Sequence, residues 1–263
     1  MKKISFYIYN QEYAQKSYAK DLAGYSASLG FEVEEFGADV DCTVVLGGDG
    51  TMLAAAREVA QKSTPILGIN MGKVGYLTDV EAEFGHNALQ KLKLNDYKIE
   101  TRMMLSTEII YEKTSLVCLN DIAIHRGQNP RPIHLRLDIN GEYVDKFTAD
   151  GVVIATPTGS TAYNLSAGGP LLAPDAKMIA ITPICPQSLT ARPTVVACDE
   201  VITITVKNLP QTMISCDGEA IFIDQQNDEI QIVVRRSPLV TNIVKTHNLS
   251  FYEVFREKVK KLI

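Results

Sequence analysis

The chain has 263 residues, 46% of them hydrophobic, with a formal net charge of −5 at pH 7 and a pI near 5.5. This length and apolar content suffice for one large hydrophobic core or two modest ones, which excludes a disordered chain. The negative net charge does not indicate the basic surface that nucleic-acid binding requires. No stretch approaches the roughly 20 apolar residues that span a bilayer, so we expect a cytoplasmic protein without membrane or nucleic-acid partners.

The N-terminal part alternates apolar runs typical of strands with amphipathic segments typical of helices. Residues 4–10 form an apolar and aromatic run, and after it Tyr18, Leu22, Tyr25 and Leu29 recur at helical spacing. Further strands are predicted at 31–36, 43–46 and 65–70, and further helices at 52–61 and 82–94. Because strands that alternate with helices form parallel sheets, this pattern predicts an α/β domain with a doubly wound sheet over residues 1–97.

From residue 98 onward, helical periodicity nearly disappears and short β-rich segments follow one another. These segments lie at 106–112, 116–125, 134–141, 151–157, 178–184, 201–208, 220–224 and 229–235. Between alternating runs lie Asn140-Gly141 and Asp217-Gly218, dipeptides typical of tight hairpin turns, because such turns need residues that tolerate a positive φ. Residues 98–248 are therefore predicted to form an all-β, sandwich-like domain.

The C-terminal residues predict a capped helix. Ser250 is followed three residues later by Glu253, the spacing of a capping box, and Val254 and Phe255 begin an apolar face. We expect residues 249–263 to form a helix that returns to the N-terminal domain.

Cysteine usage indicates neither a disulfide framework nor a protein-bound metal. The cysteines are odd in number and scattered, with no CxxC motif or Cys/His cluster at metal-ligand spacing. We interpret them as reduced core residues: Cys42, Cys118, Cys185, Cys198 and Cys216.

The segment GGDG at 47–50 lies between a predicted strand and a predicted helix. Its bare backbone lets a phosphate approach, and the helix N-terminus adds positive potential. A carboxylate would repel phosphates there unless it holds a metal ion or takes a proton from an incoming hydroxyl, and both tasks belong to phosphoryl transfer. The alternative is structural: Asp49 stabilises the turn and Thr51 caps the helix. The segment matches neither a P-loop nor a GxGxxG motif.

A second glycine-rich stretch, residues 150–174, directly follows an apolar strand. Its hydroxyl and amide side chains suit ribose and phosphate, and Tyr163 offers an aromatic face for a base or a nicotinamide ring. A polar loop built of turn residues is the alternative interpretation.

Four motifs together resemble the NAD kinase family in order and spacing. They are GGDGT at 47–51, GKVGYL at 72–77, LND at 119–121 and ADGVVIATPTGSTAYNLSAGGP at 149–170. Diacylglycerol kinases, sphingosine kinases and phosphofructokinases use turns related to GGDGT, whereas the TPTGSTAY and SAGGP block is highly specific to NAD kinases. The resemblance covers nearly the whole chain and implies an N-terminal α/β domain, a C-terminal β-sandwich and a C-terminal segment that returns.

The resemblance implies transfer of the γ-phosphate of ATP to the 2′-hydroxyl of the adenosine ribose of NAD, giving NADP and ADP, with another nucleoside triphosphate or polyphosphate as the alternative donor. Asp49 would be the general base, and Gly48, Gly50 and Thr51 would belong to the nucleotide-binding turn. Mg²⁺ or another divalent cation would lie mainly on the substrate phosphates, with no protein ligand assigned.

The resemblance also assigns residues that bind the nucleotides. Asn120 and Asp121 match the family's Asn-Asp or Asn-Glu pair and suit the adenine edge and ribose hydroxyls, because an amide offers donor and acceptor while a carboxylate accepts. A turn at a strand end is the alternative for this pair. Tyr76 would line the adenosine pocket, and Asp150 would contact the nicotinamide end, often across a subunit interface. The dinucleotide-binding run is matched by Thr161, Ala162, Tyr163 and Ser166.

Two positions depart from the family pattern. Thr148 stands where many members have arginine or lysine, and Lys146 could replace that phosphate contact only if the strand end twists or frays. Cys185, on the expected ligand wall, stands where alanine is common. The family further implies a homotetramer or homodimer with sites near subunit interfaces.

Two other functions remain open. A lipid kinase of the diacylglycerol kinase type would share the GGDGT turn, although nothing past residue 60 supports it. A nucleotide-binding sensor would keep the pocket without the chemistry, and the presence of Asp49 argues against it. His125 and Arg126 could meet a phosphate or simply end a strand in solvent.

Overall fold

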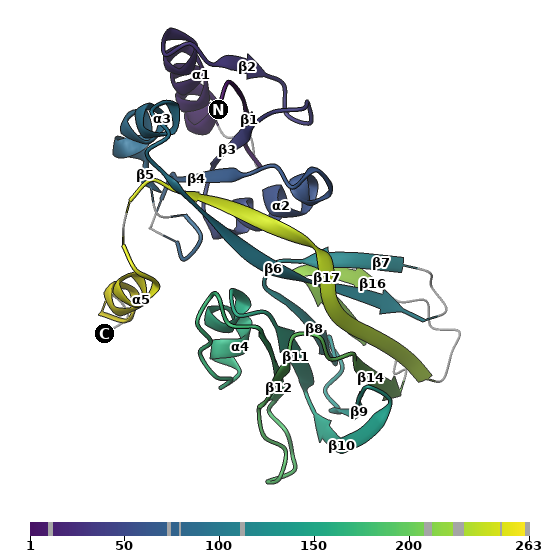
Figure 1. Cartoon of the computed structure of the whole chain (residues 1–263). Helices are drawn as coiled ribbons and strands as arrows, with labels where there is room; N and C mark the ends of the chain where they lie inside the picture. Colours follow the sequence, from purple (N-terminus) through teal and green to yellow (C-terminus); the bar gives the residue numbers. More distant parts are fainter. Residues whose placement is uncertain are drawn as a thin grey trace. The chain divides into compact units, whose positions relative to one another are not determined.

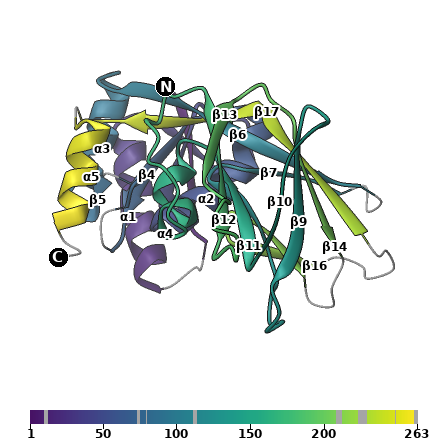
Figure 2. The same ribbon diagram turned by 90° about the horizontal axis from the view of Figure 1, so that it is seen from below.

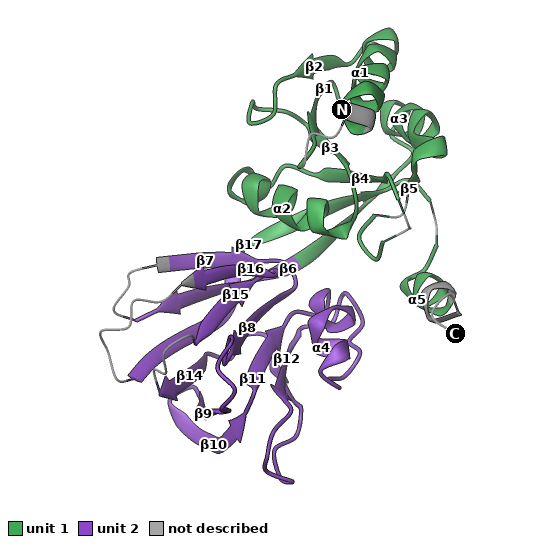
Figure 3. Cartoon of the chain, turned by 180° about the vertical axis from the view of Figure 1, so that it is seen from behind, with its two compact units in different colours: residues 1–102, 239–263 green, residues 103–238 purple. Residues whose placement is uncertain are grey.

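The computed structural model describes residues 1–9, 13–72, 75–78, 80–110, 114–207, 212–222, 229–247 and 249–260. The chain forms two compact units, residues 1–102 with 239–263 and residues 103–238 (Figure 3). Strands β6 (Lys98–Ile109) and β17 (Glu229–Lys245) each contribute residues to both units. The domain boundaries predicted after residues 97 and 248 remain predictions.

A parallel sheet lies at the centre of the first unit (Figure 1). Its strands are β1 (Lys3–Tyr7), β2 (Glu32–Glu34), β3 (Cys42–Leu46), β4 (Ile66–Asn70) and β5 (Val80–Glu81). The helices are α1 (Tyr13–Ser28), α2 (Asp49–Val59) and α3 (Gly85–Lys93), with 3-10 turns at Ala60–Lys62 and Ala82–Phe84. The strand order is β5-β4-β3-β1-β2, and the end of β17 pairs in parallel with β4, Ile243 opposite Ile66.

Helices cover both faces of this sheet. Leu67 of β4 packs in one core with Leu22 of α1 and Leu89 of α3. The next residue, Gly68, faces the opposite side, where an added Cβ would lie 2.8 Å from Sδ of Met52 in α2. The doubly wound α/β fold predicted from the alternation of elements is therefore confirmed.

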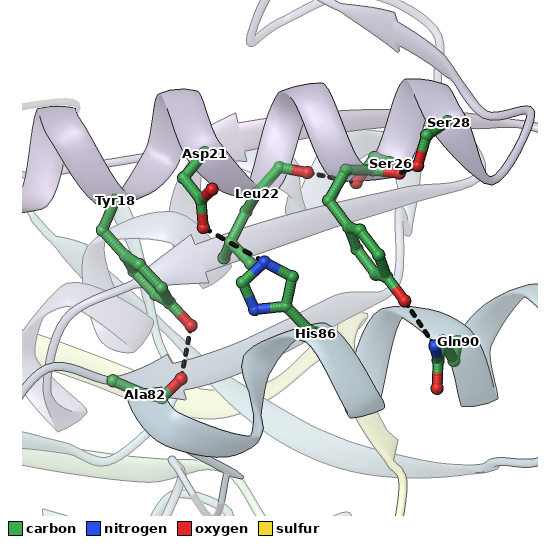
Figure 4. Close-up of polar contacts among 9 residues, drawn as sticks. Tyr18, Asp21, Leu22, Ser26, Ser28, Ala82, His86 and Gln90 are labelled. Atoms are coloured by element: carbon green, nitrogen blue, oxygen red, sulfur yellow. Dashed lines mark hydrogen bonds and ion pairs between the residues drawn. The ribbon is translucent and has the colours of Figure 1, made fainter.

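Polar contacts join α1 to the segment around α3 at the edge of that core (Figure 4). The Tyr18 hydroxyl donates to the carbonyl of Ala82, and His86 Nε2 lies 3.1 Å from Asp21 Oδ2. Leu22 is fully buried, and the other three apolar positions predicted on this helix face pack against the same core. The predicted amphipathic helix is confirmed.

Two sheets, built mainly of antiparallel pairs, make up the second unit (Figure 2). Besides β6 and β17, its strands are β7 (Thr114–Cys118), β8 (Asp121–His125), β9 (Ile133–Ile139), β10 (Glu142–Ala149), β11 (Gly151–Ala155), β12 (Met178–Ile184), β13 (Thr194–Ala197), β14 (Ile202–Lys207), β15 (Met213–Cys216) and β16 (Glu219–Phe222). One sheet has the order β13-β12-β11-β8-β15-β16, and the other contains β10-β9-β14-β17, with β6 paired to β17 and β7 to β6.

The two sheets share one apolar core. Ile154 of β11, Ile204 of β14 and Ile232 of β17 are fully buried members of it, which confirms the predicted sandwich. No strand segment was predicted at β5, at the inner strand β15, or at the edge strands β10 and β13. An edge strand exposes much of its length to solvent, so its sequence lacks the continuous apolar run by which the inner strands are recognised.

Both predicted hairpin turns are present. Asn140 and Gly141 join β9 to β10 with φ of 52° and 81°, and Asp217 and Gly218 join β15 to β16 with φ of 51° and 81°. Two successive positive φ angles define the type I′ turn that matches the twist of paired strands.

The predicted C-terminal helix is also present, as α5 (Phe251–Lys260). Its capping box is complete, because the Ser250 backbone N–H donates to Glu253 Oε2 at 2.7 Å and the Glu253 N–H donates to Ser250 Oγ at 3.2 Å. The last three residues of the predicted helix, 261–263, lie outside the described residues.

Within the described part of the chain, no helix has the length and apolarity to cross a membrane.

Leu22 provides a test of the α1 packing. We expect Leu22→Ala to lower the free energy of unfolding by about 3 kcal/mol, because the fully buried side chain leaves a cavity in the core of the first unit. Leu94→Ala is the matched control, since Leu94 is 77% exposed and its truncation removes little packing. Urea denaturation followed by circular dichroism measures both variants, and an equal effect of the two would contradict the packing.

Candidate functional site

The GGDGT turn leads from β3 into α2, which begins at Asp49. The Asp49 carboxylate binds a second turn, residues 75–78, that follows β4. Its Oδ2 accepts the N–H of Tyr76 at 2.7 Å, while Oδ1 accepts the N–H groups of Leu77 at 3.0 Å and Thr78 at 3.2 Å. The Thr78 hydroxyl also donates to Oδ1, at 3.2 Å. The two motifs GGDGT and GKVGYL are thus joined through one side chain, although Lys73 and Val74 of the second lie outside the described residues.

Close approach of the two turns requires a residue without a side chain at position 75. A Cβ added to Gly75 would lie 1.7 Å from Asp49 Oδ1 and 2.5 Å from Thr78 Oγ1. The Gly75 N–H donates to the carbonyl of Thr78 at 3.1 Å, and Asn70 Nδ2 donates to the Thr78 hydroxyl at 3.0 Å. The turn is therefore held from β4 as well as from α2.

The two oxygens of Asp49 differ in how fully they are used. In the described structure Oδ1 accepts three hydrogen bonds and Oδ2 accepts one, so a lone pair of Oδ2 is free to accept another donor. Asp49 is half-buried between the exposed residues Gly48 and Gly50. This arrangement suits a carboxylate that is fixed in direction and still open to a ligand.

The N-terminus of α2 is open to an anion. Gly48 occupies the N-cap position, no side chain caps the helix, and so the predicted alternative that Thr51 is only a helix cap is wrong. The first N–H groups of a helix lack partners within the helix and carry partial positive charge. With exposed glycines on either side of Asp49, a phosphate can reach them.

In the second unit, Asn120 and Asp121 lie at the start of β8. The backbone N–H groups of Leu119, Asn120 and Asp121 donate to the carboxylate of Asp217, at 2.9, 2.7 and 3.3 Å. In return, the Asp217 N–H donates to the carbonyl of Asp121 at 3.0 Å. Sequence reasoning recognised Asp217 only as a turn residue, because the turn it binds lies 96 to 98 positions away.

The glycine-rich stretch after β11 holds the same turn from the other side. The Thr156 hydroxyl donates to the carbonyl of Leu119 at 2.6 Å, and its N–H donates to the carbonyl of Asn120 at 2.8 Å. A Cβ at Gly159 would lie 2.1 Å from the Asn120 carbonyl oxygen, so this approach needs glycine. The motifs LND and TPTGSTAY therefore form one site.

The side chains of Asn120 and Asp121 differ in burial. Asn120 is half-buried, while Asp121 is only 5% exposed. Burial, and after it the negative charge of Asp217, raises the pKa of Asp121 to about 7. A carboxyl group with this pKa changes its charge near neutral pH, which is typical of functional sites.

An internal network shapes the rest of the glycine-rich stretch. It contains a 3-10 turn at Gly159–Thr161 and the short helix α4 (Tyr163–Ser166). Asn164 is fully buried: its Nδ2 donates to the carbonyls of Ser160 and Pro170, and its Oδ1 accepts from the Thr182 hydroxyl at 2.6 Å. The predicted ligand residues stay accessible, with Tyr163 42% exposed, Ser166 exposed, and Thr161 and Ala162 half-buried.

Asp150 lies where β10 ends and β11 begins, and it forms an ion pair. Arg126 Nε donates to Asp150 Oδ1 at 2.8 Å, so the guanidinium that could have met a phosphate has an acidic partner. Cys185 is exposed at the end of β12, next to the residue that accepts the Asp150 N–H, so the prediction that it is a core residue is wrong, whereas the other four cysteines are buried. Thr148, the departure from the family pattern, lies 2.8 Å from Nδ1 of His134 through its hydroxyl.

The predicted site residues thus form two sets. Those of the first unit are Gly48, Asp49, Gly50, Thr51 and Tyr76, and those of the second are Asn120, Asp121, Asp150, Thr161, Ala162, Tyr163, Ser166 and Cys185. Among the described residues, no three His, Cys, Asp or Glu side chains gather as metal ligands.

Known proteins match the chain over most of its length. The family description "ATP-NAD kinase N-terminal domain" matches residues 1–97, and "ATP-NAD kinase C-terminal domain" matches residues 119–246. An NAD kinase from Carboxydothermus hydrogenoformans is 41% identical over 234 residues, which cover 88% of this chain and 83% of that protein. The structure of an NAD kinase from Archaeoglobus fulgidus in complex with ATP has a TM-score of 0.79 at 26% identity, covering 99% of both chains. Yeast NADH kinase complexed with NADH shares the fold, with a TM-score of 0.85 at 23% identity over 99% of this chain and 88% of that one.

Gly75→Ala tests the contact between the two turns of the first unit. We expect it to lower the free energy of unfolding by about 2 kcal/mol, because the new methyl group would overlap the Asp49 carboxylate. Gly24→Ala is the control: Gly24 lies in α1 with open space around it, and there alanine should stabilise the helix by up to about 1 kcal/mol. Urea denaturation measures the free energy of unfolding of both variants. Stabilisation by both substitutions would contradict the contact described between Gly75 and Asp49.

Proposed function

Because the chain belongs to the NAD kinase family and phosphorylates NAD to NADP with ATP as donor, we propose that Asp49 is the general base of this reaction. The observation that supports this role is that the two carboxylate oxygens of Asp49 accept different numbers of hydrogen bonds. Three donors fix Oδ1, so the carboxylate cannot rotate, while Oδ2 keeps a lone pair for the proton of the substrate. The family assignment also decides against the lipid-kinase and sensor alternatives.

In the proposed step, Asp49 Oδ2 accepts the proton of the 2′-hydroxyl on the adenosine ribose. The hydroxyl oxygen forms a bond to the γ-phosphorus of ATP, and the bond between that phosphorus and the β,γ-bridging oxygen breaks, releasing ADP. Proton acceptance by a positioned base contributes about 10²- to 10⁴-fold to such rates. The remaining acceleration comes from positioning and charge stabilisation.

The open N-terminus of α2 is proposed to face the transferred phosphate. Gly48, Gly50 and Thr51 would leave the backbone N–H groups accessible to phosphate oxygens. A divalent cation bound to the phosphates of the donor would neutralise their negative charge.

The second unit is proposed to hold the NAD. Asn120 and Asp121 offer an amide and a carboxylate for the adenine edge and the ribose hydroxyls, and neither side chain has a hydrogen-bond partner among the described residues. The rest of the dinucleotide would be bound by the accessible residues of the following run, Thr161, Ala162, Tyr163 and Ser166, with the Tyr163 ring for stacking. Tyr76 and Cys185 are proposed as further contacts of the nucleotide.

Asp150 is proposed to contact the nicotinamide end of NAD bound by another subunit of a homodimer or homotetramer. Its ion pair with Arg126 fixes one oxygen, Oδ1, and leaves 38% of the side chain exposed. The cytoplasmic location also remains a prediction.

Asp49→Asn tests the general base. We expect the variant to form NADP from NAD and Mg-ATP at least about a hundredfold more slowly than the wild type, because an amide cannot accept the proton. A strictly NADP-dependent dehydrogenase measures the product. Since Asp49 also holds residues 76–78, NAD binding is measured by calorimetry beside the rate.

The two measurements separate catalysis from structure. A low kcat with a dissociation constant for NAD within a few-fold of wild type supports the base. Wild-type turnover would show that Asp49 is a structural residue, and equal losses in rate and binding would assign its effect to the displaced turn.

Mixed oligomers test the shared site. If Asp150 acts on the neighbouring subunit, chains carrying Asp150→Ala and chains carrying Asp49→Asn should be more active when unfolded together and refolded than either variant is alone. The expected gain arises because some sites then combine an intact Asp49 with an intact Asp150. Activity no higher than the sum of the separate variants would count against a shared site.

A further inference from the structure

Asp217, in the hairpin between β15 and β16, is a carboxylate without a part in the proposed chemistry. It is the acceptor for three consecutive backbone N–H groups, those of Leu119, Asn120 and Asp121. Two of these residues carry the side chains proposed to recognise adenosine.

We propose that Asp217 is a positioning residue for NAD, which fixes the backbone from which Asn120 and Asp121 present their side chains to the adenosine end. The proposal rests on the recognition role of Asn120 and Asp121 proposed above. Asp217 itself acts through these two residues and not on the nucleotide.

The hydrogen bonds of the turn support this role. Every backbone polar group of residues 119–121 is engaged: Asp217 binds the three N–H groups and the carbonyl of Asp121, while Thr156 binds the other two carbonyls. No peptide plane of the turn can rotate without breaking one of these bonds. The side chains of Asn120 and Asp121 are left to bind a ligand in a fixed direction.

Hairpin geometry alone does not require this carboxylate. The other type I′ turn of the unit has asparagine at the corresponding position, Asn140, whose amide oxygen accepts the N–H of Val201 at 2.9 Å. An amide has one acceptor atom, whereas a carboxylate has two, and here Asp217 Oδ1 serves Asn120 and Asp121 while Oδ2 serves Leu119. The acceptor capacity of aspartate matches the three donors of the turn.

Asp217 also acts on Asp121 through its charge. Burial is the main cause that raises the pKa of Asp121 to about 7, and the negative charge of Asp217 adds to it. The neighbouring Cys118 thiol and Tyr163 hydroxyl are neutral near pH 7, because burial raises the pKa of each. Protonation of Asp121 turns one of its acceptor oxygens into a donor and removes the negative charge that strengthens hydrogen bonds from ribose hydroxyls, so NAD should bind more tightly above pH 7 than below it.

Asp217→Asn provides the test, because asparagine tolerates the same turn, carries no charge, and places an N–H₂ group where one acceptor was. NAD binding is measured by calorimetry without ATP between about pH 5.5 and 8.5, a range that brackets the titration of Asp121. We expect the dissociation constant at the upper end to rise by about tenfold or more, as for loss of a hydrogen bond to a charged group. The midpoint of the pH dependence should move to lower pH, because the neighbouring negative charge is gone.

Two further variants separate geometry from charge. Thr156→Val removes the bond to the Leu119 carbonyl and the acceptor of the Gly159 N–H without changing charge, so we expect weaker NAD binding with an unchanged midpoint. Asn140→Asp alters the other hairpin, and both quantities should stay at wild-type values. If Asp217→Asn does not fold, as judged by thermal melting, Asp217→Gly replaces it, because glycine tolerates the positive φ of this position and lacks the carboxylate, and wild-type affinity and midpoint in that variant would overturn the proposal.

Asp121→Asn distinguishes this proposal from the one on which it rests. If it binds NAD like the wild type at every pH, the recognition role of Asp121 fails. If Asp121→Asn weakens binding while Asp217→Asn keeps the wild-type affinity and midpoint, the positioning role of Asp217 fails and the recognition role stands.

Discussion

A carboxylate that accepts the backbone N–H groups of a distant turn is the interaction on which each of the two sets of site residues depends. Asp49 binds residues 76–78 in this way in the first unit, and Asp217 binds residues 119–121 in the second. Turns lack the ladder of hydrogen bonds that fixes a helix or strand, and each N–H left unpaired in a buried place would cost about 1–3 kcal/mol. The two aspartates satisfy these groups and so give each turn a single conformation.

This interaction explains the glycines of the motifs better than backbone flexibility does. Gly75 lies where a Cβ would overlap the Asp49 carboxylate, and Gly159 lies where one would overlap the Asn120 carbonyl. Both positions are places where two turns touch. The glycine-rich character of the motifs therefore reflects packing between segments as much as room for a nucleotide.

The carboxylates of Asp49 and Asp121 lie in different environments, which suit them to different roles. Asp49 is half-buried, with one oxygen fixed and the other open beside a helix N-terminus, which suits a base that accepts a proton from a hydroxyl. Asp121 is nearly fully buried near the charge of Asp217, so its pKa is raised to about 7 and its charge changes with pH near neutrality. Pairs of acidic groups in unlike surroundings commonly divide such roles at enzyme sites.

The sequence by itself determined the alternation of strands and helices in the N-terminal part, the β-rich character of the part that follows, both hairpin turns, the capping box at Ser250, and the motifs that carry the family. These features depend on residues close together in the chain, and periodicity and turn chemistry record them directly. Only the tertiary structure decided which turns meet. Asp217 was recognisable as a turn residue but not as the acceptor for residues 119–121, and Asp49 was recognisable in its turn but not as the partner of residues 76–78. The edge strands β10 and β13 were missed as well. The contacts of Asp49 and Asp217 with distant turns depend on which strands become neighbours in a sheet. No local pattern of residues records that order.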